Sequence, residues 1–158
     1  MLPLGSALAA MGDSDSGSPT AAPEKAGNAP ASAEGGEAEA YFQQATGAIR
    51  QERFDAAIGA LQQVLDRRPN DADALNLMGY SQRRTGHLDR SLDYYNKALA
   101  LNPNHIGANE YLGELYLEMK DVKKAEERLA ILEKVCGTSC EEYIELREKI
   151  EKFKAAQG

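Results

Sequence analysis

The sequence predicts an all-α solenoid of three helix–turn–helix units, closed by a C-terminal capping helix. From residue 38 onward, three segments of 34 residues align without a gap, and their apolar residues recur at helical spacing. A fixed period of this length is typical of proteins that stack pairs of helices. A residue that ends helices recurs near the end of each segment, as Pro69, Pro103 and Gly137. A single amphipathic stretch follows the third segment and completes the predicted fold.

The composition of the 158 residues excludes several classes of function. The chain has 18 basic and 25 acidic residues, a net charge of −7 and a pI near 4.9. Binding to nucleic acid without sequence preference requires a basic surface, so we expect no nucleic-acid partner. No stretch approaches the ~20 apolar residues that span a bilayer, so we expect no stable membrane insertion.

The N-terminal part of the chain is predicted to be a leader rather than part of the solenoid. Residues 1–11 are apolar and contain Ala7-Leu8-Ala9, a pattern after which signal peptidase cuts. A basic start and a long apolar run are missing, so two interpretations stand: a truncated signal peptide, or an apolar segment with a chance match. Residues 12–37 are rich in Ala, Gly, Ser and Pro, which predicts a disordered tether.

The three predicted units are residues 38–71, 72–105 and 106–139, and their matching positions share side-chain size. The eighth and twentieth positions are small, as close packing between the two helices of a unit requires. The twenty-fourth position is large and is expected to fill the gap towards the next unit. These positions are Ala45, Gly79 and Gly113, then Ala57, Ser91 and Ala125, then Leu61, Tyr95 and Leu129. We expect helices over 38–51, 55–68, 72–85, 89–102, 106–119 and 122–136, with Asn70, Asp71 and Asn104 as candidate caps of the helices that follow them.

Residues 140–158 contain the predicted capping helix. Over 141–154 the apolar residues recur every three or four positions and form one stripe, backed by charges of both signs. A polar-backed terminal helix of this kind covers the open end of a solenoid and keeps it soluble. Ser139 and Glu142 match a capping box, which would make Ser139 the N-cap of this helix.

The repeat pattern resembles the tetratricopeptide repeat (TPR) family over residues 38 to 139. This resemblance implies a right-handed α-solenoid. The sequence departs from the family pattern at Gln82, Leu132 and Gly137. The run Cys-Glu-Glu-Tyr at 140–143 also resembles the C-terminal helix of small exported bacterial TPR proteins. In the central unit the matching residues are Met78, Gly79, Gly86, Ser91, Tyr94, Tyr95, Ala98 and Pro103.

The resemblance implies that the first helices line a concave groove that binds extended peptides. The groove is expected to be apolar in the first unit, amide, aromatic and basic in the second, and acidic in the third. We expect the grip on a peptide in the central unit, where an amide such as that of Asn76 can pair with a peptide backbone; the alternative is that Asn76 is a solvated side chain. The predicted groove residues are Phe42, Thr46, Ile49 and Arg50, then Asn76, Tyr80, Arg83 and Arg84, then Glu110, Glu114 and Glu118.

The acidic residues of the third unit allow two interpretations. Glu110, Glu114 and Glu118 lie four residues apart, so they form one stripe on a helix and repel one another. A repulsive stripe on a groove favours a partner with a basic segment. The alternative is that neighbouring basic side chains neutralise the stripe, namely Arg83, Arg84 and Lys120.

One subclass of the family clamps the C-terminal carboxylate of chaperone tails with Lys and Asn at fixed groove positions. Different residues occupy those positions in this chain, so that ligand is not expected here. They are Phe42, Thr46, Leu77 and Gly107.

The two cysteines, Cys136 and Cys140, flank the junction between the third unit and the capping helix. The ends of adjoining helices approach closely enough for a disulfide, which is the favoured pairing in an exported protein. Two alternatives are reduced, partly buried thiols and a thiol-exchange or Cu(I) site.

No set of residues in the sequence suggests catalysis. His87 and His105 are isolated, and the sequence lacks a metal-ligand cluster, a nucleophile elbow and a phosphate-binding glycine loop. We therefore predict a non-enzymatic protein without cofactor or metal, which binds a protein or peptide partner as an adaptor in the bacterial periplasm or envelope. The first alternative is a cytoplasmic TPR secretion chaperone, and the second is a thiol- or copper-handling protein that uses the cysteine pair. The sequence predicts no oligomeric state.

Overall fold

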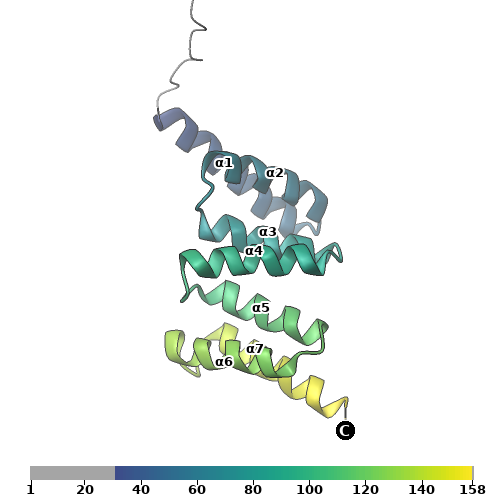
Figure 1. Cartoon of the computed structure of the whole chain (residues 1–158). Coiled ribbons are helices and arrows are strands. Elements are labelled where there is room, and N and C mark those ends of the chain that lie inside the picture. Colours follow the sequence, from purple (N-terminus) through teal and green to yellow (C-terminus); the bar gives the residue numbers. More distant parts are fainter. Residues whose placement is uncertain (1–30, 158) are drawn as a thin grey trace, which may run out of the picture.

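The computed structural model describes residues 31–157, which form seven α-helices and no strand. Figure 1 shows them stacked along the chain, from α1 and α2 at the top to α6 and α7 together at the bottom. The predicted architecture of three helix pairs and a terminal helix is confirmed. None of the helices in this part of the chain has the length and apolar character needed to cross a membrane. The helices are α1 (Ala31–Arg50), α2 (Phe54–Arg67), α3 (Ala72–Arg84), α4 (Leu88–Leu101), α5 (Ile106–Glu118), α6 (Val122–Cys136) and α7 (Glu141–Ala155).

The helix bounds follow the 34-residue period closely except at the N-terminus. Helices α2 to α7 begin and end within one residue of the predicted bounds. Helix α1 begins at Ala31 instead of residue 38, so the last part of the predicted tether is helical. The predicted signal segment, residues 1–11, and residues 12–30 lie outside the described residues.

The turn inside each unit repeats down to its backbone conformation. The fifteenth residue of each unit has a positive φ: 56° at Glu52, 83° at Gly86 and 62° at Lys120. The amide of the next residue donates to the carbonyl five residues earlier, at 2.8–2.9 Å in all three turns. This left-handed ending closes a helix C-terminus and favours glycine, which only the central unit supplies.

The core is a row of three connected clusters rather than one central core, as expected where each unit packs only on its neighbours. At the centre, Tyr95 is fully buried, and its ring lies 2.7 Å from where a Cβ on Gly79 would stand. Glycine at the eighth position therefore lets α3 and α4 cross closely, as predicted. The matching Gly113 on α5 instead faces Leu146 of α7, so here the small residue makes room for α7 rather than for α6, the other helix of its own unit.

Two of the predicted helix caps are wrong. Asp71 caps α3 as expected, with its Oδ1 2.9 Å from the amide of Ala74. At α5, however, the cap is His105 rather than Asn104, and its Nδ1 accepts from the amide of Ala108 at 3.1 Å. Helix α7 has Cys140 at its N-cap position with no side-chain cap bond, so the expected capping box at Ser139 does not form.

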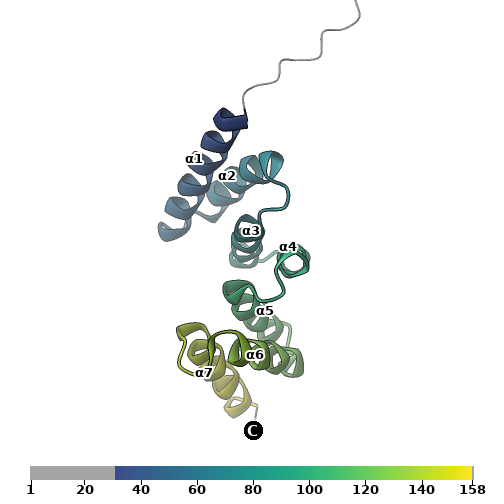
Figure 2. The ribbon, with the colours of Figure 1, turned by 90° about the vertical axis from the view of Figure 1, so that its left-hand side faces the viewer.

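The terminal helix α7 packs against both α5 and α6. Figure 2 shows α4 to the right of α3 and α7 to the left of α6, so α7 continues the side of the solenoid formed by the first helices. Cys136 at the end of α6 and Cys140 before α7 are joined by a disulfide, with their Cα atoms 5.8 Å apart. The disulfide therefore fixes where α7 starts relative to the third unit.

Candidate functional site

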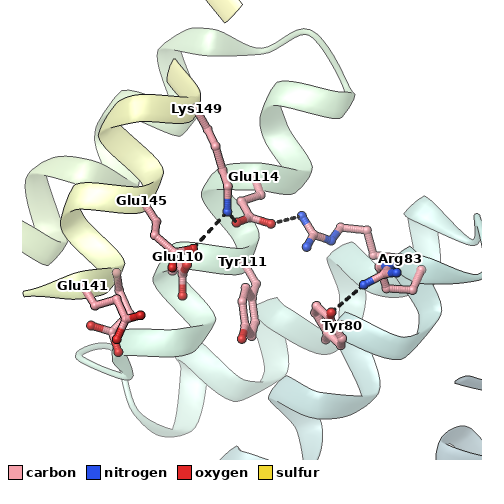
Figure 3. A pocket seen from close by; sticks show the side chains of 10 residues that line it. Tyr80, Arg83, Glu110, Tyr111, Glu114, Glu141, Glu145 and Lys149 are labelled. Carbon is pink, nitrogen blue, oxygen red and sulfur yellow. Dashed lines mark hydrogen bonds and ion pairs between the residues drawn. The ribbon is translucent and has the colours of Figure 1, made fainter. Parts of the chain in front are cut away.

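A pocket of about 500 Å³ lies on the face formed by α3, α5 and α7. Figure 3 shows carboxylates gathered on one side of this pocket and the side chains of Tyr80 and Arg83 on the other. All of its lining residues are charged residues or tyrosines, which α3, α5 and α7 position side by side. The lining residues are Tyr80, Arg83, Arg84, Glu110, Tyr111, Glu114, Glu141, Glu142, Glu145 and Lys149.

A chain of ion pairs crosses the base of the pocket from α3 to α7. Arg83 Nη1 lies 2.5 Å from Glu114 and 3.4 Å from Glu118. Lys149 on α7 donates to the other carboxylate oxygen of Glu114 and to Glu145, at 3.2 Å in the second case. Only 7% of the Arg83 side chain and 11% of the Glu114 side chain are exposed, so the central pair is internal. The outer members of the network, Glu118, Glu145 and Lys149, are 42–47% exposed.

Glu110 is the exception in this network. Its residue is 5% exposed, yet its carboxylate makes no hydrogen bond or ion pair with any residue from 31 to 157. Burial raises the pKa of Glu110 to about 8, and repulsion from Glu114 and Glu145 adds to this rise. Lys149 lowers that pKa in part, whereas Glu142 raises it further.

Aromatic side chains form the wall opposite the carboxylates. The rings of Tyr80 and Tyr111 have centroids 5.0 Å apart. Burial, and after it the negative charge of Glu110, raises the pKa of Tyr111 to about 12. Arg84 Nη1 donates to the Tyr80 hydroxyl at 2.7 Å, and its guanidinium lies 4.5 Å from the ring centroid of Phe54. Arg84 is thereby held against the α3 side of the pocket.

The pocket has more unneutralised negative than positive charge. Arg83 and Lys149 are paired with carboxylates inside the pocket, and Arg84 is 3.6 Å from Glu52, which is not a lining residue. Within the described part of the chain, three lining carboxylates have no ion-pair or hydrogen-bond partner: Glu110, Glu141 and Glu142. The arrangement favours a ligand that brings positive charge.

The structure brings together only part of the predicted groove. Five of the eleven predicted residues line the pocket, and Glu118 reaches Arg83 at its margin. The first-unit residues lie elsewhere, in contacts of their own: Phe42 packs on the core, and the Thr46 hydroxyl donates to the carbonyl of Gln43 at 2.9 Å. Ile49 is half-buried and Arg50 is exposed.

Asn76, the expected peptide-gripping amide, is a packing residue in this structure. It is 6% exposed, and its Nδ2 lies 3.1 Å from where a Cβ on Gly107 would stand, at the contact between α3 and α5. Its Oδ1 is buried and has no hydrogen-bond partner among residues 31–157. Direct contact between this amide and a peptide backbone would require α3 and α5 to separate.

Five lining residues were not predicted from the sequence. Four of them come from α7, which the 34-residue register, extended past residue 139, aligns with a first helix through its packing residues Tyr143 and Leu146; the groove positions were not extended to it. Polar residues on such a helix border the groove. The fifth, on α5, is adjacent to a predicted groove residue. The residues are Tyr111, Glu141, Glu142, Glu145 and Lys149.

Comparison with known proteins relates the chain to one family. Tetratricopeptide-repeat models match residues 42–106 and 83–150. An uncharacterized protein, ycf37 of Pyropia yezoensis, is 35% identical over 63 residues; this match covers 40% of the chain and 35% of ycf37, so the chain spans about a third of that relative.

Solved structures share the fold at low sequence identity. The first TPR of Spaghetti (RPAP3), bound to the HSP90 peptide SRMEEVD, has a TM-score of 0.68 at 16% identity and covers 77% of this chain and 94% of its own. The TPR2B domain of yeast Sti1, in a pHsp70 complex, has a TM-score of 0.68 at 17% identity, and the match covers 77% of this chain and 98% of that domain. MamA of Desulfovibrio magneticus RS-1 has a TM-score of 0.58 at 23% identity, with coverages of 61% and 55%.

The two family matches together run from residue 42 to residue 150 and cover well over half of the chain. They include α2 to α6 and most of α7, the helices whose packing follows the 34-residue period. The chain therefore belongs to the tetratricopeptide repeat family.

Proposed function

We propose that this protein is a non-catalytic interaction module that holds an extended segment of a partner protein on the face of α3, α5 and α7. The observation that carries this proposal is the pocket of about 500 Å³ on that face, built from all three helices and closed at one end by α7. Two TPR domains of the same fold are seen with partners, Spaghetti with an HSP90 peptide and Sti1 in a pHsp70 complex. The predicted groove residues Tyr80, Arg84 and Glu110 are the ones on which a segment would lie.

The partner segment is proposed to be basic. The acidic stripe has two interpretations, and neutralisation by neighbouring basic side chains is correct for Glu114 and Glu118, because both pair with Arg83. No basic side chain of the described residues neutralises Glu110 or the two carboxylates that α7 adds to the pocket, Glu141 and Glu142. An acidic peptide such as SRMEEVD would add negative charge to these groups, so we expect it not to bind here.

We propose an oxidising location, such as a bacterial periplasm or envelope, where the protein acts as an assembly adaptor. A disulfide between Cys136 and Cys140 persists in such compartments and is rare in the cytoplasm. The alternative, a cytoplasmic secretion chaperone, predicts two free thiols in protein isolated under non-reducing conditions. Thiol titration of the native protein separates the two. A disulfide uses both sulfur atoms, so we do not propose copper binding.

Selection from a displayed library of random peptides, panned against the full chain, tests the groove directly. We expect enriched peptides that share basic residues and that bind Tyr80→Ala about tenfold or more weakly, the loss typical of an aromatic contact residue. Tyr94→Ala is the matched control, since Tyr94 is also half-buried but lies on α4, outside the pocket. Failure to enrich any peptide, or equal losses in the two variants, would contradict the proposal.

A further inference from the structure

We infer that the recess around Glu110, between α5 and α7, is a binding site for a single cationic side chain, a lysine or an arginine, of the partner. The inference rests on the proposed function in that the side chain belongs to the bound segment. It adds the anchoring residue and the ligand chemistry. It also assigns to α7 a role beyond covering the end of the solenoid.

The first step concerns the state of Glu110 itself. A carboxyl group on a residue that is only 5% exposed normally has a hydrogen-bond or ion-pair partner, because an unpaired buried polar group is costly. Glu110 has none among residues 31–157, although Arg83 and Lys149 line the same pocket. Its carboxylate borders the pocket instead, with Glu145 beside it (Figure 3). The fold therefore places a carboxyl group at the pocket wall and leaves its partner to be supplied from outside, and a cation bound there would stabilise the ionised form.

The second step concerns which partner fits. The carboxylate oxygens of Glu110, Glu114 and Glu145 lie within 4.8 Å of one another, a spacing that also suits a metal ion. Two of these three carboxylates are already bound by cations, since Glu114 accepts from Arg83 and Lys149 and Glu145 accepts from Lys149. A divalent ion needs several free oxygen ligands and would be repelled by the Lys149 ammonium beside it. An ammonium or guanidinium group needs only the free carboxylate and extends the existing chain of ion pairs.

The third step concerns the entrance. Glu141 and Glu142 stand in the first turn of α7 at the edge of the pocket and have no ion-pair partner in the described structure. Carboxylates around a buried one attract a cation and exclude an anion. The Tyr111 ring packs against Tyr80 and lines the pocket beside Glu110. It offers an apolar surface to the methylene groups of a long side chain that reaches Glu110. The recess thus combines an attracting rim, an apolar wall and a buried acceptor.

A titration of the full-length protein with small probes tests this site without knowledge of the partner. The probe is a blocked five-residue peptide with one central lysine, and the matched probes carry glutamine or glutamate in its place. In ¹H–¹⁵N spectra we expect saturable shifts of the amides of Glu110, Tyr111 and Glu145 with the lysine probe alone. In Glu110→Gln the lysine probe should bind about tenfold or more weakly, as for loss of a charged hydrogen bond.

Glu133→Gln is the control variant, because Glu133 is exposed on α6 and its replacement changes the net charge equally, far from the pocket. It should leave the affinity for the lysine probe within about twofold, since distant exposed charges are screened. Equal shifts with the lysine and glutamine probes, or an unchanged affinity in Glu110→Gln, would overturn the inference. If the display experiment yields binding peptides but the lysine probe causes no shifts, the cationic site is refuted while the peptide groove still stands. A lysine response without any selected peptide would support the site and refute the proposed peptide groove.

Discussion

Replacing Glu110 by Gln is expected to stabilise the folded protein in mildly alkaline solution and to have little effect in acid. Glu110 is buried between α5 and α7, and the pKa of its carboxyl is about 8 instead of the ordinary 4.5. Burial is the main cause, followed by repulsion from Glu114 and Glu145. Gln has the size of the protonated acid but never ionises, so the variant does not carry the cost of a buried charge.

The sign follows from proton linkage. The folded state binds the Glu110 proton more tightly than the unfolded state does, so the protonated carboxyl favours folding below pH 4.5. This contribution is lost as the pH rises from 4.5 to about 8, and above that value Glu110 is charged in both states. At about 1.4 kcal/mol per pH unit, the upper bound is about 5 kcal/mol. The pocket opens to solvent, and because water and Lys149 screen the charge, we expect about 2 kcal/mol.

Urea unfolding of the full chain at about pH 5 and about pH 8.5 measures this difference. The gap in unfolding free energy between Glu110→Gln and the unmodified protein should be near zero at the lower pH and reach about 2 kcal/mol at the higher one. Glu133→Gln, which removes an exposed carboxylate, should show no such growth. A gap that does not change with pH, or a Glu110→Gln protein that is less stable at pH 8.5, would refute the reasoning.

Two further perturbations test the packing and the attachment of α7. Gly79→Ala should destabilise the protein by about 1–3 kcal/mol in urea unfolding, because the new Cβ would lie 2.7 Å from the Tyr95 ring. The control Gly59→Ala, whose new Cβ would have nothing within 4 Å, should be neutral or stabilising by about 0.5–1 kcal/mol. Equal effects of the two substitutions would contradict the packing between Gly79 and Tyr95. Replacing Cys136 and Cys140 by Ser should cost about 2 kcal/mol of stability and weaken binding of the lysine probe, because the acidic rim of the pocket begins next to the disulfide. Reductant should reproduce both effects in the unmodified protein and change nothing in the double variant; a reductant effect on that variant would argue against the disulfide.

Much of the fold follows from the sequence because helical repeats are specified locally. The 34-residue period fixes where helices begin and end, and it holds even for the positive φ at Glu52 and Lys120, which lack the glycine expected there. The prediction is weaker at α1, where Ala-rich residues before 38 form helix although their composition resembles a linker. It also failed at the cap of α5, because the histidine cap depends on how the chain turns after Pro103.

The candidate site was predicted only in part, for a different reason. The sequence indicated that Tyr80, Arg84 and Glu110 share a face, because they lie on first helices at the fifth, ninth and thirteenth positions, which are four residues apart. It did not reveal that Asn76 is enclosed at the contact with Gly107, since burial depends on how closely two neighbouring units approach. The Asn76 amide was therefore expected in an open groove, whereas the structure places it inside an interface.

The sequence by itself determined the class of this protein: the repeat, its period, the number of helices and the side of the array that can face a partner. These properties depend on side-chain size and helix-ending residues within each 34-residue unit. Only the tertiary structure decided which charges in the groove are already neutralised. Lys149 on α7 reaches Glu114, 35 residues earlier in the chain, whereas Glu110, one helical turn from Glu114, is left without a partner. Charge pairing depends on distances between side chains of different helices, and sequence spacing alone does not set those distances.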